Sequence, residues 1–103
     1  MVFCFNQVTF IVYILQSKSM NCYYTGFTTD LELRLEFHRN ASKNKFTAKA
    51  KDWLVVFTMN CESKKQGLLI ESHIKKMNSK VYIDNLMRYP EMRCKLLKRY
   101  NDC

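Results

Sequence analysis

Five side chains in this sequence have chemical types that could take part in catalysis. Arg34 and His38 are four residues apart in a segment with helical spacing, so their side chains project from one face of that helix. A guanidinium binds anions through a planar set of donors, and an imidazole can accept a proton near neutral pH. The other three residues are Tyr13, Tyr24 and Glu71, which lie on three further predicted elements.

Taken one at a time, these residues also have ordinary structural explanations. A tyrosine on a strand is most often a packing residue. Glu71 can form an ion pair with Lys75, which follows it by four residues on a predicted helix. His38 lies near Leu31 and Leu35, where a histidine is more often part of a core rim than a catalyst. The pattern therefore has to be judged together with the elements that carry it.

The first elements that must position these side chains are strands. Residues 8–15 are apolar, β-branched and aromatic, which predicts a strand buried on both faces. Residues 17–21 are polar and predict a turn, so a second strand over residues 22–27 would return antiparallel to the first. With a third strand over residues 53–59, the predicted fold class is α+β, a small three-stranded antiparallel sheet flanked by helices.

Helices are predicted for most of the remaining chain. The first covers residues 31–40, after hydroxyl and carboxylate caps in Thr28-Thr29-Asp30, and Thr29 and Glu32 also fit a capping box. Ser63 precedes a longer helix over residues 64–77. The apolar face predicted for that helix consists of Gly67, Ile70, Ile74 and Met77.

Two shorter helices are predicted near the end of the chain, over residues 81–88 and from Pro90 to residue 99. Residues 41–51 form a basic linker of mostly small or polar residues with room for a helical turn. We expect one domain over residues 1–103, with a core of about residues 8–80 and a helical extension at 81–100.

The composition indicates a globular domain and argues against a disordered chain or a membrane-spanning protein. Hydrophobic residues make up 48% of the 103 residues and charged residues 25%, which is typical of a globular domain and not of a disordered chain. The longest apolar stretch is far shorter than the roughly 20 residues that a membrane span needs. The first ten residues contain no basic side chain, so they lack the charged start of a signal peptide.

The five cysteines are widely spaced and contain no C-x-x-C pair, and neither histidine lies near a cysteine pair. This spacing of the cysteines predicts reduced thiols in a cytoplasmic protein and argues against a zinc site.

The net charge is +8, and the positive charge is concentrated in residues 34–51, which contain six basic residues and one acidic residue, Glu36. Such a segment could follow a phosphate backbone or could be a solvated face.

Several short motifs occur in a fixed order along the chain. They are Val12-Tyr13-Ile14-Leu15, Tyr23-Tyr24-Thr25-Gly26, Thr28-Thr29-Asp30-Leu31, Arg34-Leu35, His38, Phe46-Thr47, Trp53-Leu54-Val55 and Glu71-x-x-Ile74-Lys75-Lys76. In this order they resemble the GIY-YIG nuclease family, and most closely its small stand-alone bacterial members with a V-Y-I-L opening. The chain departs from the family pattern in both signature triplets, which here are Ile11-Val12-Tyr13, without glycine, and Tyr24-Thr25-Gly26, with threonine for isoleucine.

This resemblance implies a metal-dependent endonuclease that hydrolyses phosphodiester bonds, with DNA as the expected substrate. By resemblance, Glu71 would hold a single Mg²⁺ or Mn²⁺ ion, and Arg34 would bind the scissile phosphate. Tyr24 would position water or phosphate by hydrogen bonding. Either Tyr13 or His38 would accept the proton of the attacking water, and the sequence leaves that choice open.

The resemblance also implies that Gly26 provides a backbone geometry or a close approach that a side chain would block. A late asparagine found in some branches of the family has Asn78 and Asn85 as candidates. No haem, nucleotide cofactor or membrane is expected, and the oligomeric state stays open. The alternative is an accessory module that binds nucleic acid with little or no turnover. The residues expected to contact nucleic acid are Arg39, Lys43, Lys45, Lys49 and Lys51.

Overall fold

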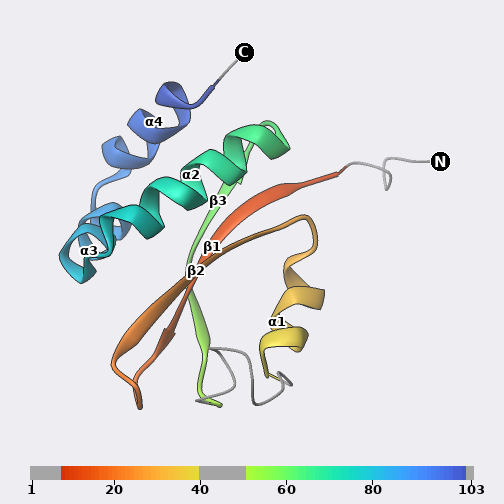
Figure 1. The fold of residues 1–103 in the computed structure, drawn as a ribbon, viewed down its shortest axis with the longest axis vertical. Helices are drawn as coiled ribbons and strands as arrows, with labels where there is room; N and C mark the ends of the chain where they lie inside the picture. The colour runs from red at the N-terminus through yellow and green to blue at the C-terminus, as the bar shows by residue number, and fades with distance from the viewer. Residues whose placement is uncertain (1–7, 40–50, 102–103) are drawn as a thin grey trace.

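The computed structural model describes residues 8–39 and 51–101, with side chains described for 8–36 and 51–101 (Figure 1). Its elements are β1 (Phe10–Ser17), β2 (Cys22–Thr28), α1 (Leu31–Arg39), β3 (Leu54–Cys61), α2 (Lys64–Met77), α3 (Lys80–Arg88) and α4 (Pro90–Arg99). The predicted α+β fold with a three-stranded antiparallel sheet is confirmed. Most of the predicted linker lies outside the described residues.

The sheet has the order β2-β1-β3, and β1 pairs antiparallel with both neighbours. The first strand is therefore central, which explains why residues on both of its faces are buried. It begins at Phe10 and not at residue 8, since Val8 precedes the strand and is exposed. Within β1, Tyr13 lies opposite Gly26 on one side and Thr58 on the other.

Helices cover both faces of this sheet. Alternate residues of β1 point to opposite faces, so Tyr13 and Leu15 face α1 while Val12 and Ile14 face α2, α3 and α4. Figure 1 shows α1 on one side of the strands and the other three helices on the opposite side. The two faces therefore have separate cores.

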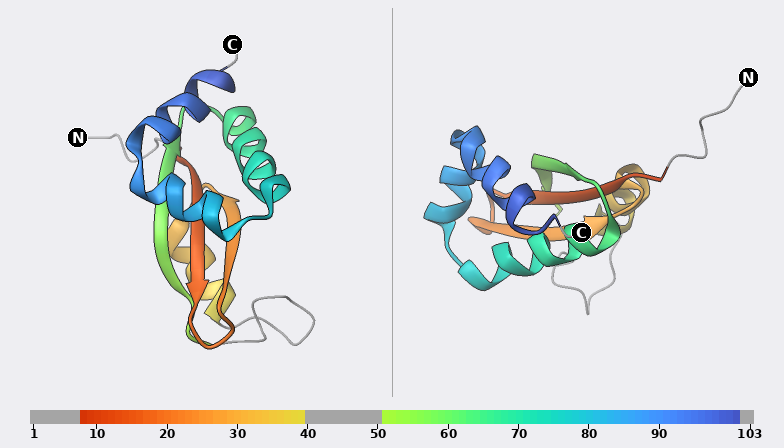
Figure 2. Two further views of the ribbon diagram at one scale, coloured as in Figure 1. Left: turned by 90° about the vertical axis from the view of Figure 1, so that its left-hand side faces the viewer. Right: turned by 90° about the horizontal axis from the view of Figure 1, so that it is seen from above.

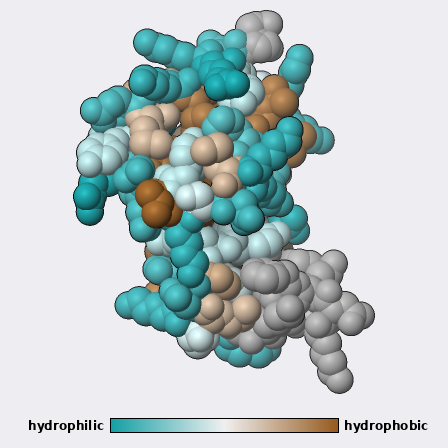
Figure 3. All heavy atoms as spheres, turned by 60° about the vertical axis from the view of Figure 1, so that its left-hand side comes forward, coloured by the Kyte–Doolittle hydropathy of each residue, from teal (hydrophilic) through white to brown (hydrophobic). Residues whose placement is uncertain are grey.

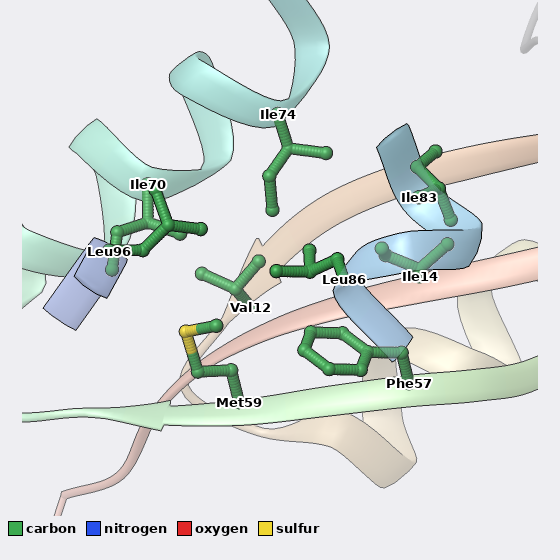
Figure 4. Close-up of a cluster of buried hydrophobic side chains, with 9 residues drawn as sticks. All are labelled: Val12, Ile14, Phe57, Met59, Ile70, Ile74, Ile83, Leu86 and Leu96. Carbon is green, nitrogen blue, oxygen red and sulfur yellow. The ribbon is translucent and has the colours of Figure 1, made fainter. Parts of the chain in front are cut away.

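The larger core lies under α2, α3 and α4 (Figure 4). Each aliphatic side chain fully buried there contributes about 1.5–3 kcal/mol to stability relative to an exposed position. Among the described residues, the nine buried members of this core are Val12, Ile14, Phe57, Met59, Ile70, Ile74, Ile83, Leu86 and Leu96. In the view of Figure 3, hydrophilic residues cover most of the coloured surface, with smaller apolar areas between them.

Helix α2 packs very close to the edge strand β2. A Cβ atom built on Gly67 would lie 2.3 Å from Cε1 of Phe27, so only glycine allows the helix this near to the strand. The left view of Figure 2 shows α2 running beside β2. Glu71 follows Gly67 by about one helical turn, so this contact also determines where Glu71 lies along β2.

The caps at the later helices agree with the sequence. The Ser63 hydroxyl accepts a hydrogen bond from the Gln66 amide at 3.0 Å, and Asn78 ends α2 in the left-handed region with φ 45°. Ser79 caps α3, and Pro90 is the first residue of α4. Polar caps of this kind satisfy amides that have no partner inside the helix.

Two local predictions are corrected by the structure. The cap of α1 is Asp30, one of the predicted caps, whose carboxylate accepts from the Leu33 amide at 3.1 Å, and the Thr29–Glu32 capping box is wrong by one residue. Met77 is 45% exposed, whereas Gln66 is buried on the sheet-facing side of α2. Gln66 is satisfied there because its amide nitrogen donates to the Leu97 carbonyl at 2.8 Å and its oxygen accepts from the Glu62 amide at 2.6 Å.

A polar clamp joins the β1–β2 turn to the segment before β3. The Asp52 carboxylate accepts hydrogen bonds from the Ser17 hydroxyl at 2.7 Å and from the Ser19 amide and hydroxyl, each at 3.0 Å. The Ser17 bond is the largest of the causes that lower the pKa of Asp52 to about 2. Within residues 8–39 and 51–101, no helix is long and apolar enough to cross a membrane.

Candidate active site

The site begins at the centre of the sheet, where Tyr13 lies fully buried on the face covered by α1. Its ring covers the backbone of Gly26 on the neighbouring strand. A Cβ atom at Gly26 would lie 2.4 Å from the Tyr13 hydroxyl oxygen and 2.5 Å from Cζ. The φ angle of Gly26 is not positive, so the glycine is needed for this close approach and not for an unusual backbone conformation.

Arg34 reaches the same place from α1. The helix is held against the sheet because Leu31 and Leu35 pack on the small core formed with Tyr13, Leu15 and Trp53. The half-buried Arg34 side chain donates a hydrogen bond to the Tyr13 hydroxyl oxygen. A guanidinium is thus fixed over the central strand.

Tyr24 lies on the edge strand β2, on the same face of the sheet as Tyr13. Its ring meets the Trp53 ring edge-on, with centroids 6.4 Å apart and planes at 65°. Charge on Tyr24 would raise the pKa of Tyr13, so the two hydroxyls are close enough to interact electrostatically. The indole of Trp53 therefore supports one wall of the site.

Glu71 comes from α2, the helix on the opposite face of the sheet, and reaches the site at the β2 edge. Its carboxylate oxygen Oε2 lies 3.0 Å from the Lys75 ammonium, and that ammonium lies 5.7 Å from the centroid of the Tyr24 ring. The Glu71 charge also acts on Tyr13, whose pKa it raises. Glu71 thus belongs to the same group as the two tyrosines and Arg34.

The protonation of Tyr13 follows from this environment. Burial is the main cause that raises its pKa to about 12, and the charges of Tyr24 and Glu71 raise it further. The hydrogen bond and the charge of Arg34 oppose these effects without cancelling them. At neutral pH the Tyr13 hydroxyl therefore keeps its proton, and it can act as a base only where further positive charge is added.

Other predicted site residues are placed only in part or not at all. His38 and Arg39 belong to α1, but their side chains lie outside the described part of the structure. Lys43, Lys45 and Lys49 are outside the described residues, and Lys51 is exposed. Asn78 is exposed at the end of α2, and Asn85 is half-buried on α3.

The residues present fit one hydrated cation better than a cage of protein ligands. Within the described residues, no three histidine, cysteine or acidic side chains are grouped as a metal would need. Glu71 is one carboxylate with 18% of its side chain exposed, and a positive group, the Lys75 ammonium, already lies against it. Mg²⁺ and Mn²⁺ suit such a site because these ions accept oxygen ligands, and Mg²⁺ commonly keeps several waters.

A groove opens beside this group, between the β2 edge and the α2–α3 junction. Its volume is about 440 Å³, and both Tyr24 and Lys75 line it. Lys75 and Trp53 both lie in motifs that resemble the family pattern, but the sequence predicts no site role for either, and for Lys75 it predicts only an ion pair with Glu71. Their contacts with Tyr24 depend on how α2 and the start of β3 approach β2, and no local pattern encodes that approach.

This arrangement of sheet, helices and converging side chains agrees with a comparison against protein families. The model of the GIY-YIG catalytic domain matches residues 9–85, most of the chain, and the protein therefore belongs to the GIY-YIG family. The match begins just before β1 and ends within α3, so α4 lies beyond it. Searches of curated proteins and of solved structures found no match. The catalytic domain of this family is a nuclease domain, which implies nuclease activity in general and a nucleic-acid substrate.

Proposed function

We propose that this protein is an endonuclease that hydrolyses phosphodiester bonds in DNA with the help of one divalent cation. The observation that carries the proposal is the meeting of Tyr13, Tyr24, Arg34 and Glu71, which come from four different elements. Two of these elements, α1 and α2, lie on opposite faces of the sheet. Simple packing needs no such group of hydroxyls, guanidinium and carboxylate at one point.

Arg34 is the residue to which we assign the scissile phosphate. Its planar donors match two phosphate oxygens, and its charge would stabilise the negative charge that grows in the transition state. Tyr13 is fully buried and accepts a hydrogen bond from Arg34. In the free protein Tyr13 therefore orients the guanidinium toward the place where the phosphate would bind.

Glu71 is the residue to which we assign the cation, Mg²⁺ or Mn²⁺. When bound, the ion would supply positive charge to the scissile phosphate and to the leaving oxygen. Tyr24, half-buried at the rim beside Glu71 and Lys75, would hold water or phosphate through its hydroxyl. Basic residues from Arg39 to Lys51 would hold the flanking backbone.

The base that takes the proton of the attacking water is Tyr13 or His38. A pKa near 12 makes Tyr13 a weak acceptor at neutral pH in the free protein, so this role requires positive charge close to its hydroxyl. His38 follows Arg34 by one helical turn and belongs to a residue type that titrates near neutral pH. If His38 is the base, activity in the Tyr13→Phe variant should retain a rise with pH between about 5.5 and 7.5.

The test of the proposed function is cleavage by the purified protein. Labelled linear, nicked and branched DNA, and RNA of the same sequence, are each incubated with Mg²⁺, Mn²⁺ or EDTA. We expect cleavage of at least one DNA form with metal and none with EDTA. Cleavage of RNA alone would correct the substrate class. Tight binding without cleavage of any substrate would replace the proposal with the accessory-module alternative.

A further inference from the structure

Lys75 holds a position that the proposed roles do not explain. Its ammonium lies 3.0 Å from Oε2 of Glu71 and 5.7 Å from the centroid of the Tyr24 ring. A lysine four residues after a glutamate can reach it, but such a pair on an open surface is weak and changes partners easily. Here the second contact, with the face of an aromatic ring, holds the ammonium on the side of α2 where the candidate site lies.

The neighbouring lysine shows that this placement is specific to residue 75. Successive residues on a helix point about 100° apart, so Lys76 leaves α2 in another direction. The charge of Lys76 acts on His73. Burial is the main cause that lowers the pKa of His73, and the charges of Arg99 and Lys76 lower it further. Lys75 and Lys76 therefore have the same charge and differ mainly in the groups they approach.

A cation bound to Glu71 would compete with Lys75 for the same carboxylate. Two positive charges about 4 Å apart repel each other unless water screens them, and Lys75 is half exposed while Glu71 is mostly shielded. The ammonium can move away because it is on a flexible stem and because the groove beside it is open. Lys80, which is the second lysine among the described residues that line this groove, already donates to the Asn21 carbonyl.

We propose that Lys75 is a positioning residue that occupies the cation's place beside Glu71 in the free protein and moves to a phosphate of the substrate strand when the divalent ion binds. This inference rests on the proposed function, in which Glu71 holds the ion. The groove lined by Tyr24, Lys75, Asn78 and Ser79 is the path that the strand would follow. Metal and nucleic acid would then assist each other, because the ion frees a positive charge for the strand.

Titration of the full chain with Mn²⁺ alone, followed by calorimetry, tests the first half of this proposal. Lys75→Met should bind Mn²⁺ about two- to fivefold more tightly than the wild type, the range expected when a partly exposed ion pair no longer competes. Lys75→Arg should bind like the wild type, because it keeps the competing charge. The matched control is Lys76→Met, which removes the same charge nearby and should change affinity by less than about twofold.

Equal Mn²⁺ affinities for Lys75→Met and Lys76→Met would overturn the proposal. The Glu71→Gln variant separates this failure from failure of the proposed function. If Glu71→Gln binds Mn²⁺ as well as the wild type, then Glu71 is not the metal ligand, and both inferences fall. If Glu71→Gln loses Mn²⁺ but Lys75→Met matches Lys76→Met, only the role of Lys75 falls.

Binding of a short DNA duplex with a phosphorothioate backbone, which resists hydrolysis, tests the second half. Fluorescence anisotropy gives duplex affinity with Mn²⁺ and with EDTA. The gain on adding Mn²⁺ should be smaller in Lys75→Met than in the wild type and in Lys76→Met. A gain of the same size in all three proteins would contradict the movement of Lys75 to the strand.

Discussion

The two faces of the sheet differ in what they bury. In the described part of the chain, the face under α2, α3 and α4 holds nine buried apolar side chains and the close contact of Gly67 with Phe27. The face under α1 has a small core in which three of the described residues are buried, one of them a tyrosine, and the half-buried Arg34 side chain reaches this core. We therefore expect substitutions on the first face to act mainly on stability, and substitutions on the second face to act mainly on the placement of polar groups. Changes on the two faces should therefore have separable effects.

The largest separate effect is expected from Arg34→Ala on the α1 face. Removing the guanidinium takes away the group assigned to the phosphate, so cleavage should fall by about 10²–10³-fold. Stability should change by no more than about 1–2 kcal/mol, since the side chain is half-buried. Single-turnover cleavage and urea unfolding measure the two quantities. Arg34→Lys keeps the charge without the planar donors and should recover only part of the rate. A rate unchanged in Arg34→Ala would remove Arg34 from the site.

On the opposite face, Ile70→Ala should reduce stability strongly and cleavage little, the reverse of Arg34→Ala. Ile70 is fully buried in the larger core, so the variant should lose about 2–5 kcal/mol of unfolding free energy. Cleavage per folded molecule should stay near the wild-type value at low temperature. The control is Leu69→Ala on the same helix, where 39% exposure predicts a smaller loss. Equal losses in the two variants would show that the core is not concentrated on this face.

Ionisation of the buried Tyr13 hydroxyl should destabilise the folded protein at alkaline pH. Its pKa is raised from 10.0 to about 12, so the unfolded chain ionises first, and the stabilisation present below pH 10 is lost as pH rises toward 12. Two units of pKa correspond to about 2–3 kcal/mol. Wild-type stability should therefore fall relative to Tyr13→Phe over this window. Parallel stability curves for the two proteins would contradict the raised pKa.

Gly26→Ala tests the contact that places Tyr13. The added methyl group would overlap the Tyr13 ring, so we expect a loss of about 1–3 kcal/mol together with reduced cleavage. In a Tyr13→Ala background the same substitution should cost much less, because the ring is gone. Chemical unfolding of the four proteins of this double-mutant cycle gives the coupling directly. If the losses of unfolding free energy in the two single variants simply add, then Gly26 is not required for the contact with the Tyr13 ring.

The elements were predictable because their signals are local. The β-branched and aromatic run of β1, the Ser63 cap and Pro90 each act within a few residues. The cap and Pro90 are found where the sequence predicts them, and β1 begins two residues later than predicted. The sequence also indicated a common face for Arg34 and His38, since the helix alone sets that spacing.

The remaining features depend on parts of the chain that meet only after folding. Gln66 is buried because the Leu97 carbonyl, 31 residues away, completes its hydrogen bonds. The approach of Lys75 to Tyr24 requires α2 to lie beside β2, and Gly67 meets Phe27 between these two elements. Periodicity marks which side of α2 is apolar, but it carries no information on which strand that side meets.

The most direct test of the central claim compares Glu71→Gln with Glu91→Gln. Both variants replace one acidic residue by its neutral isostere, and Glu91 is exposed on α4, beyond the family match. Cleavage of the preferred substrate in Mn²⁺ is measured under single-turnover conditions, with urea unfolding as the check on folding. Glu71→Gln should lose activity by several orders of magnitude while remaining folded, and Glu91→Gln should keep it. Cleavage at the wild-type rate by folded Glu71→Gln would contradict the claim.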